Sequence, residues 1–116
     1  MSEPDTYPPL KPSVFHILLA LAGGESHGYG IMQTVRDQSG GRVPMQTGSF
    51  YRHLARLIGE GLVAETPARG QRDPRRGTYY RLTPRGRQAL ERERQYLAEL
   101  LAAMGSLRPA WPKDPL

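Results

Sequence analysis

Two groups of arginines have the residue type and spacing to bind a polyanion. Arg52 and Arg56 are four residues apart, so a helix would place both on one face, one turn apart. Four further arginines lie within eight residues of one another: Arg69, Arg72, Arg75 and Arg76. A planar guanidinium donates hydrogen bonds in pairs, which suits phosphate groups and the O6 and N7 atoms of guanine. The chemistry predicted from these positions is therefore the recognition of phosphates and base edges.

The composition of the chain favours the same kind of partner. The 116 residues carry a formal net charge of +5 and suit a single domain. The absence of cysteine excludes disulfides and thiolate metal sites. No apolar run reaches the length of a membrane span, and the opening MSEPDTYPPLKP is too acidic and proline-rich for a secretory signal. We expect a cytoplasmic protein with no membrane partner.

The segment TGSFYRHLARLIGEGLV, from Thr47 to Val63, has the apolar spacing of an amphipathic helix. Its core face carries Phe50, Leu54, Leu57 and Ile58, at intervals of four, three and one. The helix is predicted to begin near residue 46 or 47 and to end at the glycines of residues 59–61. Small residues at its front would let DNA approach the free backbone N–H groups. The predicted DNA contacts on this helix are Gln46, Thr47, Gly48, Ser49, Tyr51, Arg52 and Arg56.

Two readings of this flank stay open at this point. Taken alone, it suits a solvated helix face at least as well as a DNA-binding one. Tyr51 suits a partly buried position with an outward hydroxyl about as well as a DNA contact.

The next segments predict a hairpin with a basic loop. LVAET (62–66) and TYYRLT (78–83) alternate as strands do, and they flank PARGQRDPRRG (67–77). Tyr80 and Leu82 are expected to face inward, with Tyr79 and Arg81 outward. Repulsion among the loop arginines would be relieved by DNA phosphates or a narrow minor groove. A solvated loop with no ligand is the alternative.

The first two helices precede this hairpin. One is predicted to start at Pro12-Ser13, with Ser13 as its N-cap, and to stop at residues 23–24. It is apolar nearly all round, so we expect one side to face its own domain and the other to be covered by a partner chain or a later helix. The second helix is predicted from about Tyr29 to Gln38.

The last helix is predicted from Thr83-Pro84 to about Met104, with Thr83 as N-cap. Its leucines repeat as in a coiled-coil seam, which Glu93 interrupts. The predicted homodimer interface comprises Val14, Ile17, Leu18, Leu90, Leu97, Leu100, Leu101 and Met104.

The predicted fold class is mainly α (α+β), a winged helix-turn-helix with a two-stranded wing and a long C-terminal dimerisation helix. The expected parts are a flexible arm (1–11), the winged helix-turn-helix domain (12–83), the dimerisation helix (84–104) and an irregular tail (105–116).

Enzymatic chemistry is not indicated. HGYGI (27–31) contains Gly-x-Gly, but Gln33 stands where a dinucleotide fingerprint needs glycine, and no strand is predicted before it. The three histidines lack metal-ligand spacing, and His16 is expected to be a core histidine with a satisfied partner. We expect no cofactor, no metal and no catalytic residues.

Three segments resemble the PadR family of winged-helix transcriptional regulators: HGYGI at 27–31, GSFYRHLARLIGEGLV at 48–63, and RRGTYYRLTPRG at 75–86. The resemblance covers roughly residues 12 to 104. The family commonly has Ser-Pro-Gly-Thr-Leu-Tyr where this chain has residues 46–51; Gly48 and Tyr51 match, whereas Gln46 and Thr47 depart. The predicted DNA contacts also include Tyr29, within HGYGI.

The resemblance implies a homodimer in which the C-terminal helix packs against the partner's N-terminal helix region. It also implies repression from a pseudo-palindromic site in double-stranded DNA, with release by a small aromatic or hydrophobic effector. The alternatives are a protein-interaction module, a non-specific DNA binder without ligand response, and an RNA or single-strand binder. The last would use exposed aromatic side chains, and few are expected here.

Overall fold

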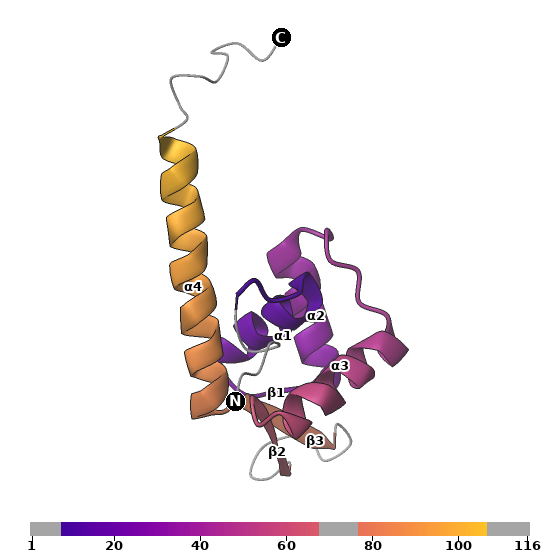
Figure 1. Cartoon of the computed structure of the whole chain (residues 1–116). Coiled ribbons are helices and arrows are strands. Elements are labelled where there is room, and N and C mark those ends of the chain that lie inside the picture. Colours follow the sequence, from indigo (N-terminus) through magenta and orange to yellow (C-terminus); the bar gives the residue numbers. More distant parts are fainter. Residues whose placement is uncertain (1–7, 68–76, 107–116) are drawn as a thin grey trace.

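The computed structural model describes residues 8–67 and 77–106, which form four helices and three strands (Figure 1). In chain order these are α1 (Pro12–Ala22), β1 (Ser26–His27), α2 (Gly28–Ser39), α3 (Thr47–Gly59), β2 (Val63–Pro67), β3 (Thr78–Leu82) and α4 (Pro84–Gly105). This order confirms the predicted mainly helical fold with a helix-turn-helix followed by a hairpin. The predicted bounds of α3 are also confirmed, because its apolar face follows the helical period without interruption.

The small sheet has one strand more than predicted. β2 and β3 pair antiparallel from Val63 opposite Leu82 to Pro67 opposite Thr78. β1 pairs with the other edge of β3, so the strand order is β1-β3-β2. The predicted two-stranded wing is confirmed by β2 and β3. β1 was not predicted, because a strand of two residues is too short to show an alternating pattern. Tyr80 and Leu82 are buried and Arg81 is exposed, as predicted for β3.

Helix α1 lies at the centre of the domain and contacts α2, α3, α4 and β3. Its Ile17 and Leu18 are fully buried within the chain. The prediction that these two residues contribute to a dimer interface was wrong, since their side chains present no surface to a partner. The partly exposed apolar residues of α1 include Phe15, Leu19 and the predicted interface residue Val14.

The start of α1 also differs from the prediction. Pro12 occupies the first turn, and Lys11 rather than Ser13 is the N-cap residue. Proline needs no backbone donor and has a suitable φ there, so the helix begins two residues earlier than a cap at Ser13 would place it.

The N-terminal arm predicted to end at residue 11 is anchored before that point. Leu10 is buried in the core, and its backbone N–H donates to Glu93 Oε1 at 3.0 Å. Glu93, which interrupts the leucine seam of α4, is itself buried by this contact. Residues 1–7 lie outside the described residues.

The first turns of α4 belong to the core of the domain. Thr83 is the predicted N-cap, and its hydroxyl accepts from the N–H of Gly86 at 3.0 Å. A side chain at Gly86 would collide with the carbonyl oxygen of Leu62, so only glycine allows this approach. Because Gly86 and Ala89 are buried, the predicted boundary between residues 83 and 84 does not separate two structural units.

The motif HGYGI places the start of α2 against α3. His27 caps α2, with its Nδ1 accepting from the N–H of Gly30 at 3.0 Å. A Cβ atom at Gly28 would collide with the hydroxyl of Tyr51 on α3. The Tyr51 hydroxyl therefore points to the start of α2, which corrects the reading in which it faces outward. This close approach fixes α3 relative to α2.

The contact between Gly28 and Tyr51 can be tested by a double-mutant cycle. We expect Gly28→Ala to lower the free energy of unfolding by about 1–3 kcal/mol, because the added methyl overpacks the contact. In a Tyr51→Ala background the same change should cost markedly less. Urea denaturation of the four proteins measures the coupling.

The matched control is Gly59→Ala, since a Cβ at this position of α3 meets no atom within 4 Å among the described residues. It should cause no loss of stability. An equal cost of Gly28→Ala in both backgrounds would show that Tyr51 is not the obstacle.

Candidate nucleic-acid interface

The outward flank of α3 carries most of the predicted DNA contacts. Phe50, Leu54 and Leu57 anchor the opposite face in the core. Ser49 is therefore half-buried. The other predicted contacts on this helix are exposed: Gln46, Thr47, Gly48, Tyr51, Arg52 and Arg56. The hydrophobic face thus determines which side chains the helix presents to a ligand.

The N-terminus of α3 is free to take an anion. Within the described residues its N-cap, Gln46, makes no capping hydrogen bond with its side chain, and the first turn holds no acidic residue. Helices leave their first N–H groups without intrahelical partners, and their dipole is positive at this end. A phosphate at this position would accept hydrogen bonds from these N–H groups and would be attracted by the positive end of the dipole.

The two arginines of α3 are held differently. Arg52 Nη2 donates to Ser49 Oγ at 3.3 Å, a long contact with a neutral acceptor. Arg56 Nε lies 3.2 Å from Glu60 Oε2, in an ion pair between side chains that are 53% and 27% exposed. An exposed pair of this kind contributes roughly 0–1 kcal/mol. Arg52 therefore reorients toward a base edge at lower cost than Arg56.

Two tyrosines flank the start of this surface. Tyr29, in the first turn of α2, is 60% exposed, and Tyr51 is 44% exposed even though its hydroxyl contacts Gly28. Tyr51 also packs edge-on against Phe50, with ring centroids 4.8 Å apart. Tyr51 therefore positions α3 and leaves part of its ring accessible.

The hairpin of β2 and β3 lies beside α3, and β2 contacts that helix (Figure 1). The predicted contacts Arg69, Arg72, Arg75 and Arg76 lie outside the described residues.

Within the hairpin Tyr80 is buried, which raises the pKa of its phenol, and nearby Tyr51 and Glu65 raise that pKa further.

Two histidines have surroundings that the sequence did not predict. His27 is the N-cap of α2, although histidine is not among the usual N-cap residues. His16 was expected to have a satisfied partner, but its buried Nδ1 has none among the described residues.

A second surface lies on α4, whose far half projects beyond the rest of the domain (Figure 1). Its exposed apolar side chains are Leu97, Leu100, Leu101 and Met104, and the last two are 72% and 53% exposed. Nearer the core, a groove of about 270 Å³ runs between α1 and α4, lined on its apolar side by Phe15, Leu19, Leu90 and Leu97. Of the predicted interface residues on the core side, Val14 and Leu90 are partly buried.

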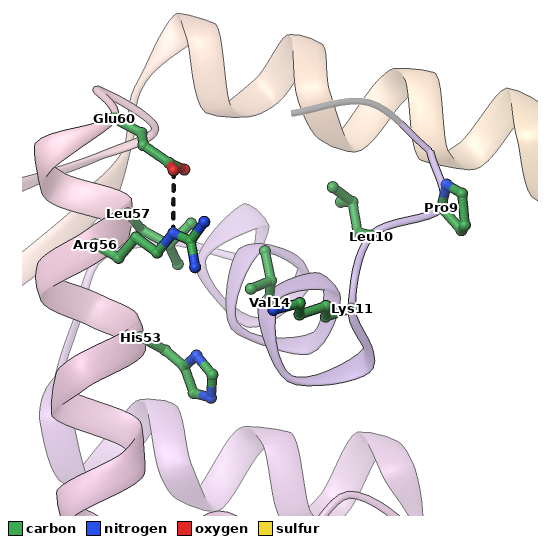
Figure 2. A pocket seen from close by; sticks show the side chains of 8 residues that line it. All are labelled: Pro9, Leu10, Lys11, Val14, His53, Arg56, Leu57 and Glu60. Atoms are coloured by element: carbon green, nitrogen blue, oxygen red, sulfur yellow. Dashed lines mark hydrogen bonds and ion pairs between the residues drawn. The ribbon is translucent and has the colours of Figure 1, made fainter. Parts of the chain in front are cut away.

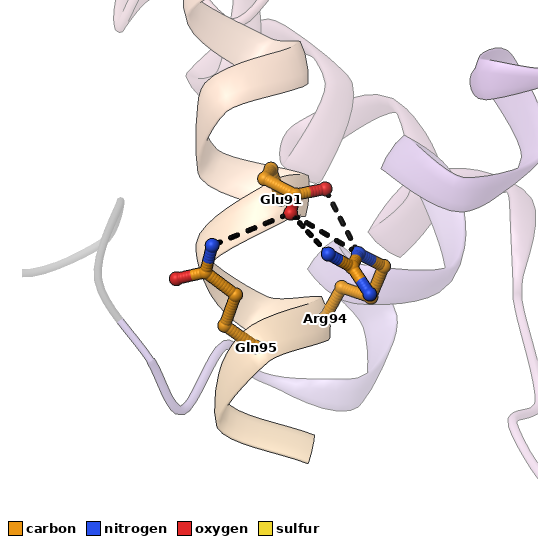
Figure 3. A network of polar contacts seen from close by, with 3 residues as sticks. All are labelled: Glu91, Arg94 and Gln95. Atoms are coloured by element: carbon orange, nitrogen blue, oxygen red, sulfur yellow. Dashed lines mark hydrogen bonds and ion pairs between the residues drawn. The ribbon is translucent and has the colours of Figure 1, made fainter. Parts of the chain in front are cut away.

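Charged residues border the groove. Arg94 Nε donates to Glu91 Oε1 at 2.9 Å, and Gln95 Nε2 donates to Glu91 Oε2 at 3.4 Å (Figure 3). The hydrogen bond from Arg94 lowers the pKa of Glu91. The groove therefore has an apolar floor and a polar rim, as protein interfaces do.

Metal-binding and membrane-spanning features are absent from the described ranges 8–67 and 77–106. These ranges contain no group of three or more His, Cys, Asp or Glu residues able to hold a metal ion. Their helices are all too short or too polar to cross a membrane.

Comparison with known proteins gives one family. The model of the transcriptional regulator PadR-like family matches residues 17–92. A curated relative, an uncharacterized 37.1 kDa protein in transposon TN4556 of Streptomyces fradiae, is 40% identical over 84 residues. The match covers 72% of this chain and 22% of the relative, so this chain corresponds to only a small part of that protein.

Solved structures share the fold. A PadR family transcription regulator from Clostridium difficile gives a TM-score of 0.69 at 23% identity, covering 84% of this chain and 98% of that one. Bacillus subtilis PadR in complex with operator DNA gives a TM-score of 0.58 at 24% identity, covering 70% of this chain and 45% of that one. At these identities the likeness establishes the fold alone.

The family match spans the helix-turn-helix, the hairpin strands and the start of α4, and its members are DNA-binding regulators rather than enzymes. This chain is a member of the PadR-like family of transcriptional regulators.

Proposed function

We propose that this protein is a homodimeric repressor that binds a pseudo-palindromic site in double-stranded DNA. In this proposal α3 enters the major groove, and the loop after β2 contacts the DNA backbone or the minor groove. The observation that carries it is the outward flank of α3, where an uncapped N-terminus without acidic residues stands next to exposed Arg52. The likeness in fold to Bacillus subtilis PadR, which was solved in complex with operator DNA, supports it.

The surface of α4 supports a dimer. Four large apolar side chains of its later half, Leu97, Leu100, Leu101 and Met104, are exposed by 41–72% within the described part of the chain. Contiguous exposed apolar surface of this kind marks an interface. A second copy would bury it, and the resulting two-fold axis would place two α3 helices in major grooves about one turn, roughly 10 bp, apart.

The groove between α1 and α4 supports control by a small aromatic or hydrophobic effector. Its volume of about 270 Å³ is close to the roughly 300 Å³ at which small-molecule pockets begin. A second α4 helix would add walls to it. An effector at this position would release DNA if it bound the DNA-free arrangement of the dimer more tightly than the DNA-bound one.

Selection from a pooled duplex library at two salt concentrations tests the DNA-binding proposal. We expect enrichment of an inverted repeat and steep loss of affinity with salt. Arg52→Ala should relax sequence preference within each half-site. Arg75→Ala and Arg76→Ala should weaken all duplexes alike and flatten the salt dependence by about one unit of slope per lost phosphate contact.

The two kinds of variant serve as controls for each other, since each removes one positive charge. Uniform loss of binding from both would contradict the base-reading role of Arg52. Salt-sensitive binding without an enriched sequence would instead indicate a non-specific DNA binder. Absence of binding at low salt would indicate a protein-interaction module.

The dimer can be tested by charging the exposed face of α4. Leu97→Glu combined with Leu100→Glu should convert the dimer to monomer, because burying two carboxylates in an apolar interface is costly. Ala102→Glu is the control, since it adds charge on the other side of the exposed helix. Sedimentation velocity measures the mass; an unchanged mass in the double variant would contradict this interface.

A further inference from the structure

A small pocket lies between α3 and the segment that leads into α1 (Figure 2). Its volume is about 100 Å³, which is enough for a small polyatomic ion. One side is apolar and is formed by Leu10, Val14 and Leu57. The pocket is separate from the groove at α4, and it shares Arg56 with the predicted DNA contacts of α3.

The polar side of the pocket carries an excess of positive charge. Lys11 comes from the N-terminal segment, and His53 and Arg56 come from α3 (Figure 2). Burial lowers the pKa of His53, and the positive charges of Arg52, Lys11 and Arg56 lower it further. An anion between these groups would offset that repulsion and favour protonated His53.

Glu60 limits which anions the pocket can bind, because it adds a negative charge beside the cations. Its Oε2 lies 3.2 Å from Arg56 Nε, whereas its Oε1 is buried and has no hydrogen-bond partner among the described residues. An ionised carboxylate only accepts hydrogen bonds. Oε1 is enclosed by its neighbours, so a ligand must displace the side chains that cover it; a ligand oxygen without a proton would then be repelled, and an O–H group would donate to Oε1. The pocket thus pairs cations for a negative charge with an acceptor for a hydroxyl.

We propose that this pocket binds a small oxyanion that retains a proton, of which hydrogen phosphate is the simplest member. Lys11, His53 and Arg56 would hold the charged oxygens, and Glu60 Oε1 would accept from the P–OH group. A phosphodiester of DNA has no such proton, so the proposed ligand is a free anion. The site does not depend on the proposed DNA-binding function.

The test compares phosphate with sulfate, which has the same shape but no proton near neutral pH. The imidazole NMR signal of His53 in the full chain is followed at pH 6.5, with chloride keeping the ionic strength constant. The His53 imidazole signal is assigned as the one that disappears in the His53→Gln variant. We expect a saturable shift with phosphate and a rise in the pKa of His53, with sulfate at least about tenfold weaker.

Two variants and a control make the test specific. Lys11→Gln should weaken phosphate binding. Glu60→Gln should abolish the discrimination and let sulfate bind, because an amide can donate where a carboxylate cannot. Arg81→Gln removes one exposed positive charge on β3, outside the pocket, and should leave the phosphate titration unchanged.

Unchanged amide signals elsewhere in each variant would show that the fold is retained. The proposal is overturned if phosphate gives no saturable shift. It is equally overturned if sulfate binds as well as phosphate to the wild-type chain, or if Glu60→Gln retains full discrimination.

Discussion

The burial of α1 is the constraint on which the rest of the structure depends. Ile17, Leu18 and Leu21 place this helix in contact with α2, α3, α4 and β3 at once. Apolar burial of this kind is the main favourable term in folding and is not directional, so the shapes of the packed helices set their positions. Because the apolar face of α3 is buried in this core, the opposite flank of the helix faces solvent or a ligand.

Close backbone approaches then fix the angles between elements. Gly28 admits the Tyr51 hydroxyl between α2 and α3, and Gly86 admits the Leu62 carbonyl beneath α4. Both glycines act through the absence of a side chain rather than through unusual backbone angles. Gly28, Tyr51 and Gly86 lie in the three segments that resemble the PadR family. Their contacts give these residues a structural role that does not require DNA.

The exposed apolar side chains and the predicted DNA contacts lie on different parts of the molecule. Arg52 and Arg56 are exposed on the flank of α3, whereas exposed large apolar side chains gather on the later half of α4. Buried Glu93 marks the change along α4, because the helix before it is held by the core and the helix after it is not. In the proposed dimer, the later half of α4 would pack against the second copy and the flank of α3 would stay accessible to DNA.

The sequence by itself determined the helices, the hairpin, the exposed arginines of α3 and the Thr83 cap, because periodicity and capping are local properties of the chain. Only the tertiary structure decided which apolar face of α1 is covered, that Leu10 is anchored by Glu93, and that β1 joins the sheet. Each of these depends on partners distant in the sequence, which an amphipathic pattern cannot identify. The pocket between residue 11 and α3 arises in the same way, since its cations come from segments about forty residues apart.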